Sequence, residues 1–236
     1  MMCQPIESVL TGNSYPGRGI IVGHSADGGK AVFLYFIMGR SENSRNRIFV
    51  ETEDGIRTKA FDEAKMTDPS LVIYNPVRVY LNYTIITNGD QTDTISDFLV
   101  SDYSFRDALL TREFEPDAPN YTPRISAIIY GDGKYDISIL KSMPSEPECC
   151  CRYFFEYDRP VAGIGHFIST YKCDGSPLPS FEGEPVTVAI DCELAEFAEK
   201  TWRCLDADNK VSLYAREIEI STGKSQSVII NKHTAM

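Results

Sequence analysis

Short runs of apolar residues, separated by turn-forming residues, recur along most of this chain. Residues 18–24, RGIIVGH, and residues 30–37, KAVFLYFI, form the clearest pair, and SADGG connects them. The Asp-Gly step in that connection is typical of a tight hairpin between two strands. In residues 211–220 the alternation changes phase, which predicts a β-bulge near Arg216. Together these patterns predict strands at 18–24, 30–37, 47–52, 71–74, 77–82, 83–88, 124–130, 135–141, 152–158, 166–172 and 211–220.

Two segments have helical spacing instead. The segment 104–114, SFRDALLTREF, predicts a helix with Ser104 as its N-cap. In residues 192–205, CELAEFAEKTWRCL, apolar positions recur at steps of three and four residues and predict one buried stripe. Because strands dominate and do not alternate regularly with helices, the pattern predicts one α+β domain over residues 1–236, with large, mostly antiparallel sheets.

Composition narrows the classes of partner. A formal net charge of -11 argues against a nucleic-acid partner, because phosphate backbones require distributed positive charge. No apolar stretch approaches about 18 residues, and no signal peptide is evident, so we expect a cytoplasmic protein without a membrane partner. The seven cysteines include no Cys-x-x-Cys pair, so zinc-type spacing is absent and we expect reduced structural thiols.

The segment MGRSENSRNR, residues 38–47, concentrates cationic donors at the end of an apolar strand. Guanidinium groups bind phosphate through paired N–H donors. If the segment is extended, the side chains of Arg45 and Arg47 share a face. A solvated polar loop is the alternative, and composition does not decide between the two readings.

Three further segments carry candidate chemistry. In TNGDQTDTI, residues 87–95, the carboxylates would bind a cation or ribose hydroxyls, although a plain turn is the more common meaning of such a sequence. In REFEPDAPNYTPRIS, residues 112–126, two prolines stiffen a loop that carries three carboxylates. Tyr74, in VIYNPVRVY, and His166, in GIGHFISTY, are both residues that we expect to be structural by default.

Taken in order, RGIIVG, GRSENSRNR, YNPVRV, TNGDQTDTI and YTPRIS resemble the archaeal-type IMP cyclohydrolase family, over about residues 15–124. The segment AGIGHFISTYKCDGSPLPSFEGEP is similar to a bacterial branch of that family. The resemblance implies a four-layer αββα fold like that of N-terminal-nucleophile hydrolases. It also implies a reaction without metal or cofactor: the carboxamide nitrogen of a formylated aminoimidazole carboxamide ribonucleotide attacks the formyl carbon, water leaves, and IMP forms.

The resemblance also implies roles for individual residues. Glu115 would transfer protons, because the family places a carboxylate before its Thr-Pro-Arg-Ile stretch, and Tyr74 would donate to the formyl oxygen. The partner would be a purine ribonucleoside monophosphate. The sequence leaves the oligomeric state open, with a homo-oligomer as one option. The predicted phosphate-binding residues are Arg18, Arg40, Arg45 and Arg47 with Ser41 and Asn46, and the predicted residues around the base and ribose are Asn88, Thr92, Asp93, Tyr121 and Arg124.

Two other functions remain open at this point. The proline-rich loop 116–123 departs from the archaeal pattern, so a regulatory protein could retain the nucleotide pocket without turnover. An amidohydrolase could use Cys3 as an N-terminal nucleophile, but only after removal of the two methionines that precede it.

Overall fold

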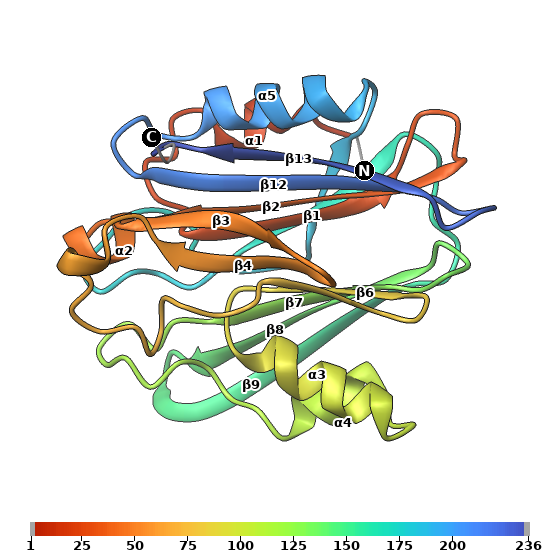
Figure 1. The fold of residues 1–236 in the computed structure, drawn as a ribbon. Coiled ribbons are helices and arrows are strands. Elements are labelled where there is room, and N and C mark those ends of the chain that lie inside the picture. Colours follow the sequence, from red (N-terminus) through yellow and green to blue (C-terminus); the bar gives the residue numbers. More distant parts are fainter. Residues whose placement is uncertain (1–2, 234–236) are drawn as a thin grey trace.

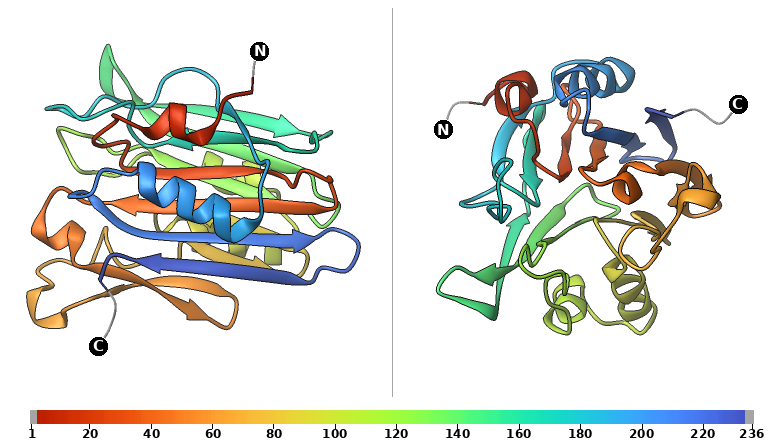
Figure 2. Two further views of the ribbon diagram at one scale, coloured as in Figure 1. Left: turned by 90° about the horizontal axis from the view of Figure 1, so that it is seen from above. Right: turned by 90° about the vertical axis from the view of Figure 1, so that its left-hand side faces the viewer.

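The computed structural model describes residues 3–233 and contains two antiparallel sheets packed face to face (Figures 1 and 2). In the first sheet the strand order is β11-β10-β1-β2-β12-β13, and in the second it is β3-β4-β5-β6-β7-β8-β9. The first sheet comprises β1 (Arg18–His24), β2 (Lys30–Met38), β10 (Ile164–Ser169), β11 (Val186–Ala189), β12 (Lys210–Glu219) and β13 (Ser225–Asn231). The second comprises β3 (Arg47–Thr52), β4 (Gly55–Ala60), β5 (Val77–Tyr80), β6 (Tyr83–Thr87), β7 (Arg124–Ile129), β8 (Tyr135–Met143) and β9 (Glu146–Tyr157).

Helices cover the two outer faces of this pair of sheets, as Figure 1 shows. One group packs on the first sheet and comprises α1 (Ile6–Leu10) and α5 (Leu194–Cys204). The other packs on the second sheet and comprises α3 (Gln91–Val100) and α4 (Phe105–Leu110). The layers therefore run helix, sheet, sheet, helix. The short helices α2 (Glu42–Arg45) and η1 (Glu63–Lys65) lie in connections.

Each interface between layers has its own apolar core. Ile20 and Val22 of β1 point into the core between the sheets, whereas Ile21 points into the core under α5. A strand buried on both faces reads as a continuous apolar run, which explains why β1 and β2 show so little alternation in the sequence.

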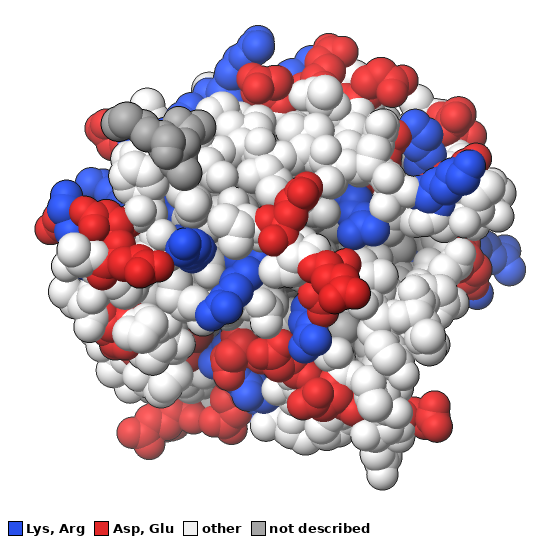
Figure 3. All heavy atoms as spheres, viewed as in Figure 1, with Lys and Arg blue, Asp and Glu red and all other residues white. Residues whose placement is uncertain are grey.

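Two parts of the α+β prediction are confirmed. The sheets are strand-rich and antiparallel, and a helix lies within residues 192–205. Within the described residues, no helix is long and apolar enough to cross a membrane. Figure 3 shows acidic and basic side chains interspersed on the face that it displays.

Three local predictions are wrong. Residues 71–74 form turns, because the Thr58 hydroxyl bonds the carbonyls of Val72 and Tyr74 in place of a strand partner. Residues 91–100 form the helix α3, whereas the turn-forming residues 87–90 favour a plain turn over this segment. The register of β12 is regular through Arg216, and its irregularity lies between Lys210 and Ser212.

The phase change in β12 has a different cause. Leu213 and Ala215 pack under α5, whereas Tyr214 belongs to the core between the sheets. Because both faces of the strand are covered, apolar residues on either face are stable, and a change of phase needs no bulge.

Candidate active site

A cavity of about 260 Å³ opens at one end of the space between the sheets. β1, β3 and β7 begin at this end and β2 ends there, so residues from distant parts of the chain meet. We call it the arginine cavity. Its lining residues are Tyr15, Arg18, Met38, Arg40, Ser41, Ser44, Arg47, Leu71, Val72, Glu115, Asp117, Asn120, Thr122, Tyr171 and Leu178.

Two arginines at strand starts supply buried positive charge. Arg47, the first residue of β3, is 1% exposed, and its Nε donates to the carbonyl of Ser44 at 2.8 Å. Arg18, the first residue of β1, lies with Nη2 at 3.8 Å from a Glu115 oxygen. Within the described part of the chain, the buried atoms Arg47 Nη1 and Arg18 Nε have no hydrogen-bond partner. A buried N–H without an acceptor is costly, so this cavity is suited to an anionic or carbonyl-bearing ligand.

The Glu115 carboxyl group is the acid at the bottom of the cavity, only 2% exposed. Burial raises its pKa above the ordinary value, although Arg18 and Arg124 act in the opposite direction. Burial likewise lowers the pKa of Arg47. A carboxyl group whose pKa is raised in this way is a better proton acceptor as the carboxylate and stays protonated to higher pH than an exposed one.

The loop that presents Glu115 is closed on itself. The Glu115 amide donates to the carbonyl of Thr122 at 2.9 Å, and the Thr122 amide donates to Asp117 Oδ1 at 2.6 Å. The Thr122 hydroxyl also contacts the Asp117 carboxylate and the hydroxyl of Tyr171. Burial raises the pKa of Tyr171 to about 12, so this phenol stays protonated.

The Tyr74 hydroxyl lies 2.8 Å from the hydroxyl of Tyr35. Both side chains are buried, and Tyr74 is close enough to Arg18 and Arg47 to influence their pKa values. Burial raises the pKa of Tyr35 well above its ordinary value. Tyr35 therefore remains protonated and can donate to Tyr74.

Comparison with known proteins identifies the family of the chain. A family model described as IMP cyclohydrolase-like protein matches residues 15–223. The chain belongs to this family. It is 28% identical over 170 residues to an IMP cyclohydrolase from Methanococcus aeolicus, covering 67% of this chain and 75% of that protein. It is 29% identical over 196 residues to an IMP cyclohydrolase from Methanopyrus kandleri, covering 71% and 89%. A Halobacterium salinarum IMP cyclohydrolase is 30% identical over 132 residues, covering 54% and 63%.

In this member of the IMP cyclohydrolase-like family, the structure brings six of the sequence-predicted residues together. Arg18, Arg40, Ser41, Arg47 and Glu115 line the arginine cavity, and Tyr74 lies behind its guanidinium groups. Arg40 at the mouth stacks over the ring of Tyr15 at 5.1 Å and pairs with Asp174 at 2.6 Å.

Arg45 and Asn46 do not line the arginine cavity. Helix α2 interrupts the segment that we expected to be extended, so Arg45 and Arg47 do not share a face. The Arg45 guanidinium donates to the carbonyl of Gly39 and to Asn209 Oδ1. Asn46 bonds the backbone of Asp62 through both ends of its amide. These contacts support the loop that carries Arg47.

None of the residues predicted around the base and ribose is among the lining residues of the cavity. Asn88 bonds the backbone of Pro123 and Ile125, which ties the start of α3 to the start of β7. Thr92 bonds the Thr87 hydroxyl, while Asp93 pairs with Arg78 on the surface at 3.0 Å.

Within this group, Arg124 is the residue whose charge acts to lower the pKa of Glu115. Its Nη1 lies 2.6 Å from Asp90 Oδ1 and 2.7 Å from Gln91 Oε1, and its buried Nε has no partner within residues 3–233. A Cβ at Gly89 would lie 2.6 Å from Arg124 Nη1, so only glycine permits this approach. Tyr121 packs against Phe114 and does not line the cavity.

The sequence analysis did not identify Tyr35, Tyr171 or Thr122 as residues of the site. Tyr35 belongs to an apolar run that predicts only core, and Tyr171 follows β10, far along the chain from the quoted motifs. No local pattern distinguishes either residue, because their role depends on contacts made across the fold. Among residues 3–233, no cluster of His, Cys, Asp or Glu could hold a metal ion.

Proposed function

We propose that this chain is an IMP cyclohydrolase, which closes the purine ring of a formylated aminoimidazole carboxamide ribonucleotide in the arginine cavity. The observation that carries the proposal is the buried Glu115 carboxyl group between arginines whose N–H groups lack acceptors. The archaeal relatives named IMP cyclohydrolase support the same reaction.

Substrate binding divides between two groups of arginines that line the cavity. Arg47, with Arg40 and Ser41 at the mouth, would bind the 5′-phosphate through charge-assisted hydrogen bonds. Arg18 would bind the formyl and carboxamide end, next to Glu115. Holding these two groups face to face can contribute roughly 7–11 kcal/mol of barrier reduction. Asn88, Thr92, Asp93, Tyr121 and Arg124 would support the wall on the base and ribose side.

The proton transfers assign distinct roles to two residues. Glu115, as the carboxylate, accepts a proton from the carboxamide nitrogen as that nitrogen bonds the formyl carbon. Tyr74, oriented by Tyr35, donates to the formyl oxygen. The formyl oxygen then leaves as water with one hydrogen from the carboxamide and one from the formamide nitrogen, and Glu115 returns its proton to restore Tyr74.

The experiment compares two arginines that are two residues apart. Turnover to IMP is followed by ultraviolet absorbance for the unmodified protein, Arg47→Met and Arg45→Met. We expect Arg47→Met to lose about 100-fold in kcat/KM, because a buried charged donor is lost. Arg45→Met should lose much less, because its guanidinium bonds Gly39 and Asn209 outside the cavity.

Equal losses in the two variants would contradict the assignment of phosphate binding to Arg47. A protein that IMP stabilises but that converts no substrate would instead be a regulatory nucleotide-binding protein. Cys3 does not line the arginine cavity, so an amidohydrolase would need a different site, and an intact mass with Met1 still attached would exclude that hypothesis.

We also infer that the layered architecture is the sandwich of N-terminal-nucleophile hydrolases, that the enzyme acts in the cytoplasm, and that it forms a homo-oligomer. The helix, sheet, sheet, helix order and the seven free cysteines support the first two inferences. Superposition on a solved member of that fold, localisation in intact cells and sedimentation analysis test the three inferences separately.

A further inference from the structure

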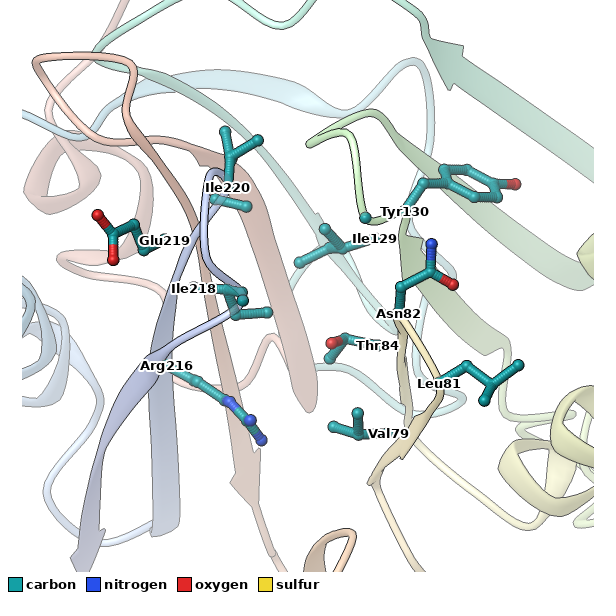
Figure 4. Close-up of a pocket in the computed structure, with 13 residues that line it drawn as sticks. Val79, Leu81, Asn82, Thr84, Ile129, Tyr130, Arg216, Ile218, Glu219 and Ile220 are labelled. Carbon is teal, nitrogen blue, oxygen red and sulfur yellow. The ribbon is translucent and has the colours of Figure 1, made fainter.

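A second cavity, of about 310 Å³, opens at the opposite end of the space between the sheets. We call it the distal cavity; its walls include Ala31, Val79, Ile129, Arg216, Ile218 and Ile220 (Figure 4). Ala31, the second residue of β2, lines this cavity, and Met38, the last, lines the arginine cavity, so the two cavities lie on the order of 20 Å apart. The ring-closing reaction makes no use of the distal cavity.

Alternate side chains at and just after the end of β12 point toward this cavity. Arg216, Ile218 and Ile220 alternate on the cavity side, whereas Glu219 points away in Figure 4 and bonds the Thr222 hydroxyl at 2.5 Å. Tyr130 also extends away in Figure 4, toward Asp136, which accepts from its hydroxyl at 2.5 Å. The cavity interior is therefore aliphatic with one positive charge.

That positive charge is incompletely satisfied. Arg216 Nη2 donates to the Ser225 hydroxyl at 2.7 Å, but its buried Nε has no partner among the described residues. No ion pair of Arg216 occurs within residues 3–233 either. The neighbouring Asn82 amide and Thr84 hydroxyl make no side-chain hydrogen bond within the same range. In Figure 4 the Arg216 and Thr84 side chains extend into the space between the walls, whereas Asn82 extends toward Tyr130. A mostly apolar space with a few polar groups is the usual composition of a small-molecule site.

An independent observation lies at the mouth of the cavity. Leu81 begins the two-residue turn between β5 and β6, where its φ is 53° and its exposed fraction is 77%. Glycine suits that backbone region, and a leucine there is strained. The positive φ of Leu81 and the exposure of its side chain to water both destabilise the folded chain. Contact with an apolar ligand would offset part of the cost of exposure.

We propose that the distal cavity is a second binding site, which takes a small organic monoanion with a branched or aromatic hydrocarbon body and a carboxylate. The carboxylate accepts from the Arg216 guanidinium, and the hydrocarbon body packs between Ile129 and Ile218, with Leu81 at the rim. Arginine is suited to this role because its planar N–H groups match a carboxylate.

The test compares 4-phenylbutyrate with its uncharged amide, 4-phenylbutyramide, by titration calorimetry on the full chain. We expect the acid to bind about tenfold more tightly than the amide, and Arg216→Gln to abolish that preference. Arg159→Gln, a change at an exposed arginine outside both cavities, is the matched control and should retain the preference. Leu81→Gly should keep the fold, because glycine accepts the positive φ, yet should bind the acid more weakly.

Methyl NMR locates the bound acid without any substitution. Shifts confined to Ile129, Ile218 and Ile220 support the proposal, and shifts at Leu178 in the arginine cavity overturn it. Absence of binding at millimolar acid, equal binding of acid and amide, or an unchanged preference in Arg216→Gln would overturn it as well. None of these outcomes depends on turnover, so the proposed function can fail or hold independently.

Discussion

At the scale of single residues, this protein buries charges that would be more stable in water. Arg47 is almost completely buried, and so is Glu115, 3.8 Å from Arg18. Burying such groups costs several kcal/mol each unless partners compensate, and several N–H groups here have none. These unpaired buried groups therefore lower the stability of the fold at the arginine cavity. This is expected at a binding site, because the ligand supplies the missing partners.

Glu115→Gln should separate binding from chemistry. The amide keeps the shape of the side chain but cannot accept the carboxamide proton, so we expect kcat to fall by about 10²–10⁴-fold while IMP still binds. Glu113→Gln, which changes an exposed carboxylate two residues earlier, should change kcat little. Steady-state kinetics and calorimetry measure the two effects, and an active Glu115→Gln variant would exclude Glu115 as the proton acceptor.

The raised pKa of Glu115 has opposite consequences for rate and stability. Because the carboxylate is the active form, kcat should fall as pH falls through a pKa above the ordinary value of 4.5. The same raised pKa stabilises the fold fully below the unfolded value, and that stabilisation is lost as pH rises through the folded pKa. Urea unfolding across this range should show the loss in the unmodified protein and not in Glu115→Gln.

At the scale of elements, the Glu115 loop derives its shape from its own side chains. Asp117 accepts from the Thr122 amide, and this contact closes the loop around Glu115. Prolines limit the conformations of the unfolded loop, but the carboxylate selects the folded one. The loop is thus a positioned element although it contains no helix or strand.

Asp117→Ala should loosen this loop. We expect kcat to fall by about tenfold or more, because a small displacement of a catalytic group is costly, while KM changes less. Asp132→Ala removes a similar turn carboxylate, which accepts from the Lys134 amide at 3.2 Å between β7 and β8. Comparable kinetics in the two variants would show that the Asp117 contact is irrelevant to catalysis.

A second element-scale contact joins the two sheets. The Tyr135 hydroxyl of β8 lies 2.7 Å from Nδ1 of His166 in β10, and Tyr157 stacks on the same imidazole at 4.0 Å. Burial lowers the pKa of His166 from 6.5 to about 4. The imidazole is therefore neutral at pH 7, and its Nδ1 shares a hydrogen bond with the Tyr135 hydroxyl.

The depressed pKa of His166 predicts a loss of stability in mild acid. The stabilisation is present above pH 6.5 and disappears as pH falls toward 4, because the unfolded chain binds the proton more readily. The urea midpoint of His166→Gln should vary less with pH across this window than that of the unmodified protein. His233→Gln, near the chain end beside Phe61, is the control and should retain the full pH dependence.

At the scale of the whole molecule, ligand binding and folding are linked. IMP at a hundred times its Kd should add about 2.7 kcal/mol to the free energy of unfolding, because only the folded chain assembles the arginine cavity. Thermal melting should show this increase in the unmodified protein and little of it in Arg47→Met. An equal increase in both proteins would place the nucleotide elsewhere.

The sequence by itself determined the elements that depend on local physics. The hairpin between β1 and β2, the strand-rich composition and the apolar stripe of α5 follow from turn chemistry and periodicity. It failed at residues 71–74 and at α3, where the side chain of Thr58 and the packing of a helix on the second sheet override local signals. The family motifs also singled out Arg18, Arg47 and Glu115 before any geometry.

Only the tertiary structure decided which of those residues act together. The four-residue helix α2 separates Arg45 from Arg47, and the packing of loops against the first sheet brings Tyr74 to Tyr35 and Glu115 to Arg18. The distal cavity is likewise invisible in the sequence, since its walls come from β2, β5, β7 and β12. Hydrogen bonds and burial depend on distances between segments far apart in the chain, and a linear pattern contains no such distances.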